Sequence, residues 1–491
     1  MKLLGFCRQF ISSAAAMAQR KPPTEPLVVI LGSTGTGKSD LAVELAVRYN
    51  GEIINADAMQ MYRGLPIITN KISEKEQRGI PHHLLGNIGL EEATWTVGAF
   101  KREATKTIRE IRSRGRLPIV VGGTHYYTNG LLFEDSLVDD SPTPTGDEAV
   151  KSQDSGSRFP ILDGPTEDMI KELRQVDPVM AERWHPNDRR KIRRSLEIYL
   201  TTGKRASDIY AEQQKRRESK LNPTGPRETH GSQWQSLLLW VYSQPEVLKE
   251  RLNQRVDKML DNGLLDETTE VYRYLQGRLA AGEDVDRTTG IWQSIGFKEF
   301  EPYLQGVAHG DHETTELGRL KQAGVDDTKT ATRQYANYQV KWITKKTLPL
   351  LRHEQALDML YLLDSTDISH WGEEVLTKGA ELTRQFLAGE QLPLAAHVSE
   401  TAREVLSSKI EVSEKRETFT PCQRKCDVCD VTIMTEERWE KHIRGNRHRR
   451  AVKSSRRTAL VPSRQAVTDL IAVEQPSSLE ERGATQDPGV A

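Results

Sequence analysis

The residues best suited to chemistry form a glycine-rich run that ends in lysine and serine. This run, Gly32-Ser33-Thr34-Gly35-Thr36-Gly37-Lys38-Ser39, matches the pattern G-x-x-x-x-G-K-[ST]. A predicted strand (27–31) precedes it and a predicted helix (40–50) follows, which is the setting the motif requires. There, backbone N–H groups surround phosphate oxygens, Lys38 neutralises charge and Ser39 can bind Mg²⁺. The motif indicates a diphosphate or triphosphate ligand; the alternative is a glycine-rich turn that binds nothing.

Three other side chains could take part in a reaction at that ligand. Asp57 follows a second predicted strand, at 53–54, and Thr124 follows a third, at 117–121. Such positions border the ligand crevice of a parallel sheet. Arg255 lies on a predicted helix whose polar face carries further basic residues. Taken singly, Asp57 and Arg255 are better explained as a solvated loop acid and a solvated helix charge, and for Thr124 the alternative is a turn hydroxyl with a local backbone bond.

A second constellation, near the C-terminus, has the spacing of a metal site. Cys426-x2-Cys429-x12-His442-x5-His448 offers two thiolates and two imidazoles, which complete a tetrahedral shell around a structural Zn²⁺. We predict that the histidines lie on a helix that begins at Thr435, and that Cys422 is not a ligand. The flank is basic, which favours RNA binding; the alternatives are protein interaction and a nuclear import signal. The basic residues are Arg444, Arg447, Arg449, Arg450, Lys453, Arg456 and Arg457.

The elements that must position these residues alternate between strand and helix. This order predicts an α/β fold: a P-loop NTPase-like parallel sheet core with an inserted helical domain and a small C-terminal zinc finger. Helices are expected at 167–183, 189–201 and 247–260, and a further strand at 237–241. Polar stretches at 135–164 and 212–233 predict loops. The expected organisation is a targeting segment (1–24), core (25–134), insertion (135–233), core (234–395), polar linker (396–420), finger (421–455) and disordered tail (456–491).

Composition narrows the possible partners and compartments. The 491 residues are 36% hydrophobic and 28% charged with a net charge of −1, so any basic surface for nucleic acid must be local. No apolar run approaches the ~18 residues of a membrane span. Three of four cysteines fall in one stretch, which favours a metal site and a reducing compartment. The basic, acid-free start resembles a mitochondrial transit peptide, the alternative being an ordinary N-terminus, and Met17 offers a second start.

Several further segments, read in order, resemble the tRNA dimethylallyltransferase family, also called tRNA isopentenyltransferases. The resemblance runs from about residue 27 to 343, and its combination of motifs is specific where the P-loop alone is common. The zinc finger resembles the matrin-like fingers of the eukaryotic branch. The segments are 55–62 (NADAMQMY), 68–71 (ITNK), 81–84 (PHHL), 120–127 (VVGGTHYY), 255–260 (RVDKML), 293–299 (QSIGFKE) and 332–335 (TRQY).

The resemblance implies a reaction and roles for particular residues. The family transfers the dimethylallyl group of dimethylallyl diphosphate to N6 of adenine 37 in tRNA and releases pyrophosphate. By this resemblance Asp57 is the general base, Thr124 lies at the reacting centre and Arg255 contacts the diphosphate, which the P-loop and Mg²⁺ bind. Residues implied to contact tRNA are Asp57, Ala58, Met59, Gln60, Arg190, Lys191, Arg193 and Arg194; for the last four, the alternative is a solvated helix face.

The sequence departs from the family pattern at one place, and it is compatible with two other functions. After residues 332–336 the family usually continues Lys-Arg-Gln, whereas this chain has Asn337-Tyr338-Gln339, which removes two positive charges and predicts weaker phosphate neutralisation. The alternatives are a P-loop kinase for a small metabolite and a non-catalytic RNA-binding protein; the intact Lys38 and Asp57 count against the second. We expect a monomer, located in mitochondria and cytoplasm, with a nuclear fraction left open.

Overall fold

The computed structural model describes residues 21–133, 159–221, 234–308, 315–414 and 421–459. Contacts divide the chain into two compact units, residues 1–141 with 210–416 and residues 142–209 with 417–491, here called the first and second units. The expectations for most of the targeting segment, for the loop at 135–158 and for the tail from 460 lie outside the described residues. Within the described residues, no helix is both long and apolar enough to cross a membrane.

A six-stranded parallel sheet organises the first unit, in the order β3-β2-β4-β1-β5-β6. Its central strand β1 pairs with β4 and β5, so that Val29 lies beside Val120 and Leu238. This confirms the predicted parallel sheet and its first strands. The strands are β1 (Pro26–Gly32), β2 (Gly51–Asn55), β3 (His82–His83), β4 (Leu117–Val121), β5 (Gln235–Tyr242) and β6 (Leu360–Asp364).

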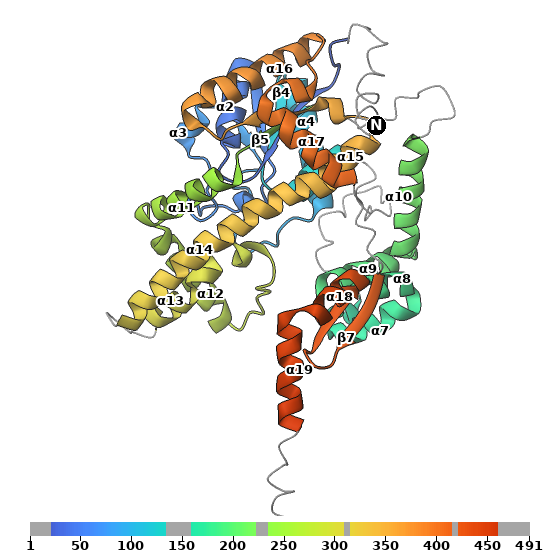
Figure 1. Cartoon of the computed structure of the whole chain (residues 1–491). Helices are drawn as coiled ribbons and strands as arrows, with labels where there is room; N and C mark the ends of the chain where they lie inside the picture. Colours follow the sequence, from blue (N-terminus) through green and yellow to red (C-terminus); the bar gives the residue numbers. More distant parts are fainter. Residues whose placement is uncertain (1–20, 134–158, 222–233, 309–314, 415–420, 460–491) are drawn as a thin grey trace, which may run out of the picture. The chain divides into compact units, whose positions relative to one another are not determined.

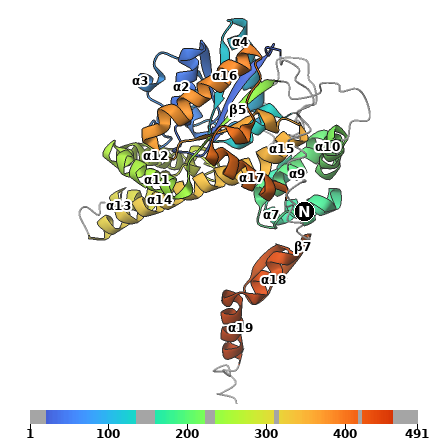
Figure 2. The same cartoon turned by 45° about the horizontal axis from the view of Figure 1, so that its top comes forward.

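Helices cover both faces of the sheet, which explains why its strands are apolar without alternation. On one face, Val28 and Ile30 of β1 pack in a core cluster with α2 (Lys38–Arg48) and α16 (Lys378–Ala388); these two helices lie side by side (Figures 1 and 2). On the other face, Leu27, Val29 and Leu31 pack in a second cluster. The helices there include α4 (Val97–Ser113), α5 (His125–Leu132) and α17 (Glu400–Glu414).

The remaining helices of the first unit bring distant segments to the sheet. The long helix α14 packs against α13 and α11, and continues through a π-helical turn into α15. Gln339 near the end of α14 thereby reaches the loops that follow β1 and β4. The bounds are α3 (Glu74–Gln77), α11 (Pro245–Asp261), α12 (Leu264–Ala280), α13 (Phe297–Ala308), α14 (Thr315–Trp342), the π-helix (Ile343–Thr347) and α15 (Leu348–His353).

The short edge strand β3 is attached to the sheet by a buried carboxylate. Glu52 of β2 has a side chain only 2% exposed, and its oxygens accept from His83 at 2.6 Å, from Arg114 at 2.6 Å and from Arg116 at 3.1 Å. Burial alone would raise the pKa of Glu52, but hydrogen bonds from Arg114 and His83 lower it to about 2. The carboxylate therefore stays charged and holds the His82–His83 segment against β2.

Two segments that we expected to be irregular are helical. The expected loop at 212–233 is wrong for its first part, because α10 spans Ala206–Leu221; residues 222–233 lie outside the described part. The expected linker at 396–420 is wrong for 400–414, which form α17. Ala402 and Leu406, one helical turn apart, are buried in the core, and Thr401 donates to Asp364 at 2.7 Å. A polar composition concealed this narrow apolar stripe.

The described residues of the second unit include the helices α7, α8 and α9 and the cysteine–histidine module. The helix expected at 167–183 is interrupted at Asp177, because Pro178 has no N–H to continue it and the Asp177 carboxylate caps the next helix at Met180. The helix expected at 189–201 is confirmed. Bounds are α7 (Thr166–Val176), α8 (Pro178–Arg183), α9 (Arg189–Thr202), β7 (Pro421–Cys426), β8 (Val431–Thr435), α18 (Glu436–Arg444) and α19 (Asn446–Ala459).

Candidate active site

Three loops meet at the carboxyl edge of the sheet, after β1, β2 and β4. The N–H of Ala58 donates to the Thr124 hydroxyl at 3.0 Å, and the N–H of Thr124 donates to the Ala56 carbonyl at 3.2 Å. A Cβ on Gly122 would lie 2.2 Å from the Ala56 carbonyl carbon, so only glycine permits this approach. The sequence elements N-A-D and G-G-T, which are 67 residues apart from Ala56 to Gly123, are therefore one structure.

The P-loop has the backbone shape that a phosphate cradle requires. Gly37 caps α2 with φ +84°, a left-handed conformation that favours glycine. At Gly32 a Cβ would lie 2.3 Å from the Val241 carbonyl oxygen of the neighbouring strand. The ammonium of Lys38 donates to the Ser33 carbonyl at 2.6 Å, and Ser39 is exposed in the first turn of α2. The loop thus presents a lysine and a helix N-terminus at the sheet edge.

The charges of the site influence one another. Removal from water lowers the pKa of Lys38, the charge of Asp57 raises it and the charge of Arg255 lowers it, and together they place this pKa at about 8. Burial likewise lowers the pKa of Arg255 to about 10, and Asp57 again opposes this. Arg255 donates to the Thr34 hydroxyl of the P-loop at 2.7 Å. The structure thus brings Asp57, Lys38 and Arg255, three residues singled out from the sequence, into one site.

Asp57 is held by its backbone as well as by its carboxylate. Asn55 accepts from the Asp57 N–H at 3.1 Å and donates to the Asp57 carbonyl at 3.0 Å and to the Leu84 carbonyl at 2.9 Å. One carboxylate oxygen accepts from the Met59 N–H at 3.1 Å. Burial raises the pKa of Asp57, an effect that the Met59 N–H and the charge of Lys38 oppose. A fixed carboxylate beside a lysine can act as a proton acceptor.

Sequence reasoning missed two side chains that connect the loops. Gln339 is 2% exposed; its amide oxygen accepts from the Thr34 N–H at 2.7 Å, and its nitrogen donates to the Gly123 carbonyl at 3.0 Å. Tyr335, one turn earlier, has a pKa raised by burial and by the charge of Asp57. The sequence did contain a signal for Gln339, because it continues at helical spacing the row of α14 residues that the structure shows to be buried. The other members of this row are Thr328, Thr332 and Ala336.

The residues implied to contact tRNA fall into two groups. Ala58 is buried and Met59 packs on the core, while the Gln60 amide donates to the carbonyls of Thr69 and Asn70. The other four lie on α9 in the second unit. Arg190 is exposed, Lys191 pairs with Asp188, and Arg193 and Arg194 both pair with Glu197.

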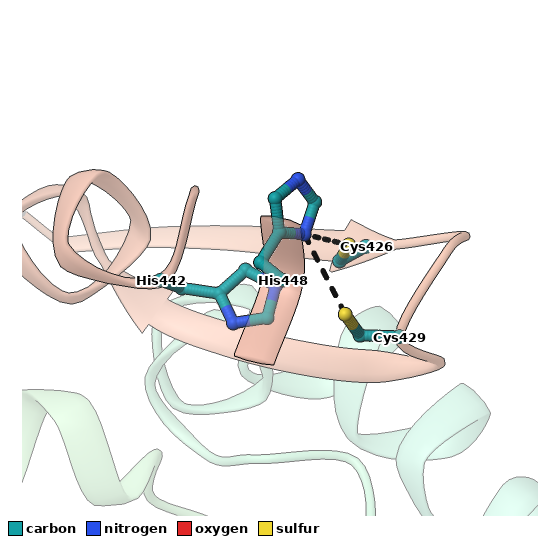
Figure 3. Close-up of side chains that lie close together, drawn as sticks. All are labelled: Cys426, Cys429, His442 and His448. Atoms are coloured by element: carbon teal, nitrogen blue, oxygen red, sulfur yellow. Dashed lines mark hydrogen bonds between the residues drawn. The ribbon is translucent and has the colours of Figure 1, made fainter. Parts of the chain in front are cut away.

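The four residues with metal-ligand spacing converge in the second unit (Figure 3). Their ligand atoms all lie within 4.8 Å of one another, and His448 Nδ1 is 3.5 Å from the sulfur atoms of both Cys426 and Cys429. Helix α18 begins after Thr435, whose hydroxyl accepts from the Arg438 N–H, as predicted, and it carries His442. The prediction of one helix for both histidines is wrong, because α18 ends at Arg444 and His448 lies on the next helix, α19. Cys422 lies apart, with its thiol directed to the Ile433 carbonyl at 3.9 Å. This arrangement is compatible with a Cys₂His₂ zinc finger.

Comparison with known proteins relates this site to one enzyme group. The profile of a family described as IPP transferase matches residues 60–346, more than half of the chain. The tRNA dimethylallyltransferase of Schizosaccharomyces pombe is 37% identical over 448 residues, which cover 89% of this chain and 96% of that protein. The tRNA dimethylallyltransferase of Homo sapiens is 37% identical over 434 residues, covering 88% and 87%. A crystallographically solved eukaryotic dimethylallyltransferase acting on tRNA is 34% identical with a TM-score of 0.70, covering 89% of this chain and 98% of that one.

Proposed function

The chain belongs to the IPP transferase family, and from this premise we propose that it is a tRNA dimethylallyltransferase. It moves the dimethylallyl group of dimethylallyl diphosphate to N6 of adenine 37 in tRNA. The bond between C1 of the prenyl group and the diphosphate oxygen breaks, and a bond between C1 and N6 forms. One proton leaves N6, and pyrophosphate departs with the electron pair of the broken bond.

The diphosphate is bound by the P-loop and the two cations beside it. Lys38 and Arg255 stabilise the negative charge that develops on the leaving pyrophosphate. Arg255 is already directed at the loop through its hydrogen bond to Thr34. The exposed hydroxyl of Ser39 and the glycine cradle fit a Mg²⁺–diphosphate ligand; Mg²⁺, when bound, supplies further neutralisation of the leaving group.

Asp57 accepts the proton from adenine N6. The nitrogen is a weak nucleophile because its lone pair is delocalised into the ring, so proton removal assists attack. Asp57 must be ionised to do this; burial opposes ionisation, and the Lys38 charge and the Met59 N–H favour it. The Thr124 hydroxyl accepts from the N–H of Ala58, the residue after Asp57, which supports the placement of Thr124 near the reacting centre.

An adenine within an anticodon loop must leave its stack to reach Asp57. Ala58, Met59 and Gln60 follow Asp57 directly and are proposed to border the extruded base. The exposed Arg190 and Lys191 of α9 and the basic helix α19, which carries His448, suit the phosphates of an RNA. Zinc would stabilise the finger, whose ligands close the metal's shell.

The observation that carries this proposal is that Asp57, Lys38 of the P-loop and Arg255 of α11 influence one another within one site. The test is to incubate the protein with dimethylallyl diphosphate, Mg²⁺ and a tRNA that carries A36-A37-A38, and to search the digested RNA for isopentenyladenosine by mass spectrometry. We expect the product with the wild type and none with Asp57→Ala, which still binds tRNA. Tight tRNA binding without product would favour a non-catalytic RNA-binding protein, and ATP turnover in a parallel reaction would favour a kinase.

A further inference from the structure

Beside the active site lies a group of three aromatic rings, here called the aromatic platform: Tyr126, Trp342 and Tyr338. Tyr126 and Tyr338 each contact the ring of Trp342, with centroids 5.8 Å apart in both pairs. The rings meet at 66° and 57°, so they are not stacked upon one another. Tyr126 is 41% exposed and Tyr338 is 54% exposed, so much of each ring remains accessible to a ligand.

The platform is continuous with the reacting centre. Tyr126 is in the first turn of α5, two residues after Thr124, and Tyr338 immediately precedes Gln339, which bonds to Thr34 and Gly123. The Tyr126–Trp342 contact therefore joins the end of α14 to the start of α5. A ligand on the platform would lie next to a ligand that occupies the site.

Positive charges flank the rings. Lys341, Lys345 and Lys346 are exposed, and they lie within four residues of Trp342 in the sequence, where α14 passes into the π-helical turn. π-helical turns are rare in proteins, and those that occur are often found at functional sites. Aromatic rings interleaved with lysines form the surface that single-stranded nucleic acid requires, since bases stack on the rings and the cations track the backbone.

On the basis of the proposed function, we propose that the aromatic platform stacks an unpaired base of the anticodon loop beside the adenine that reacts. Stacking of a base on Tyr338 contributes affinity through the aromatic face, and this contribution does not involve neutralisation of a phosphate. Tyr126 and Trp342 support the ring and extend the surface.

The test compares tRNA affinity across a series of salt concentrations for the wild type, Tyr338→Ala, Tyr338→Phe and Tyr338→Arg. Loss of one base–aromatic contact is expected to raise the Kd of Tyr338→Ala roughly tenfold without changing the slope of log Kd against log salt. Tyr338→Phe should bind like the wild type because it keeps the ring. Tyr338→Arg should steepen the slope by about 1 because it adds a phosphate contact. Leu279→Ala, which removes a similarly exposed apolar side chain from α12, is the matched control.

A direct readout uses anticodon-loop RNA in which 2-aminopurine replaces one base at a time, because stacking quenches its fluorescence. We expect at least one loop position whose quenching is present with the wild type and Tyr338→Phe and lost with Tyr338→Ala. Equal affinity of Tyr338→Ala and wild type, within about twofold, or quenching unaffected by the alanine, would overturn the platform and leave a protein partner as the occupant. If the wild type forms no isopentenyladenosine yet shows the stacking, the proposed reaction fails and the platform stands.

Discussion

Replacing Gln339 with leucine tests whether one buried amide joins the P-loop to the loop after β4. Leucine is of similar size but cannot hydrogen bond, so the Gly123 carbonyl and the Thr34 N–H both lose their partner. A buried carbonyl left unpaired costs about 1–3 kcal/mol, and the partly buried N–H costs about 1 kcal/mol. We therefore expect Gln339→Leu to lower the free energy of unfolding of the first unit by about 2–4 kcal/mol.

The same change should also impair binding of the diphosphate. The Thr34 N–H belongs to the P-loop, and Arg255 donates to the hydroxyl of the same residue. Loss of the Gln339 contact should let Thr34 move, and both the P-loop backbone and Arg255 should shift with it. Weakened charge-assisted contacts cost on the order of 1–2 kcal/mol, so we expect the KM for dimethylallyl diphosphate to rise about tenfold. Urea unfolding followed by tryptophan fluorescence and steady-state kinetics measure the two effects.

Two further variants make the result interpretable. Gln334→Leu changes an exposed glutamine on the same helix and should leave stability and KM unaltered. Gln339→Glu keeps the acceptor for the Thr34 N–H, loses the donor to Gly123, and adds a negative charge near Asp57. It should raise the pKa of Asp57 and move the acid limb of kcat/KM to higher pH. The reasoning is refuted if Gln339→Leu matches Gln334→Leu in both stability and KM.

Four other predictions concern single groups. Asp57→Asn should lower kcat about a hundredfold to ten-thousandfold at unchanged tRNA affinity; since burial raises the pKa of Asp57, the wild-type kcat/KM should fall with decreasing pH above the range of an ordinary aspartate, and the variant should lack this limb. Glu52→Gln should destabilise the first unit by about 2 kcal/mol near pH 7, a modest loss because Arg114 and Arg116 are only partly buried. The depressed pKa of Glu52 stabilises the fold at pH values above the ordinary glutamate pKa of 4.5, and this stabilisation is lost as the pH falls towards 2. Urea unfolding of the wild type and the variant should therefore differ less at pH 3 than at pH 7. Chelation or Cys426→Ser should release one zinc per chain and reduce the helical circular dichroism of the finger, whereas Cys422→Ser should retain the metal; equal zinc loss would contradict the ligand assignment. A fluorescent fusion of the full chain should reach mitochondria and one that begins at Met17 should not; the targeting proposal fails if neither does.

The sequence alone determined those features that are encoded by short, local patterns. The P-loop is continuous in sequence, and its glycines, lysine and serine predict the turn, the helix and the ligand class together. The cysteine–histidine spacing likewise predicts a closed metal shell, because its four ligands lie within one short module. Apolar runs predicted the first strands of the sheet, because a parallel strand buried on both faces has no polar alternation.

The tertiary structure decided whatever depends on the register between distant segments. Gln339 resembles any other glutamine on a helix, and only the packing of α14 against the sheet places its amide between Thr34 and Gly123. In the sequence, Tyr338 is noticeable only because it stands where a positive charge was expected. In the structure it is an exposed ring that contacts Trp342. The helix α17 was hidden for a related reason: its few buried side chains gain their stabilisation from a core formed by strands far away in the chain. A side chain's neighbours across the fold are set by the whole core, and that information is not present in its local sequence.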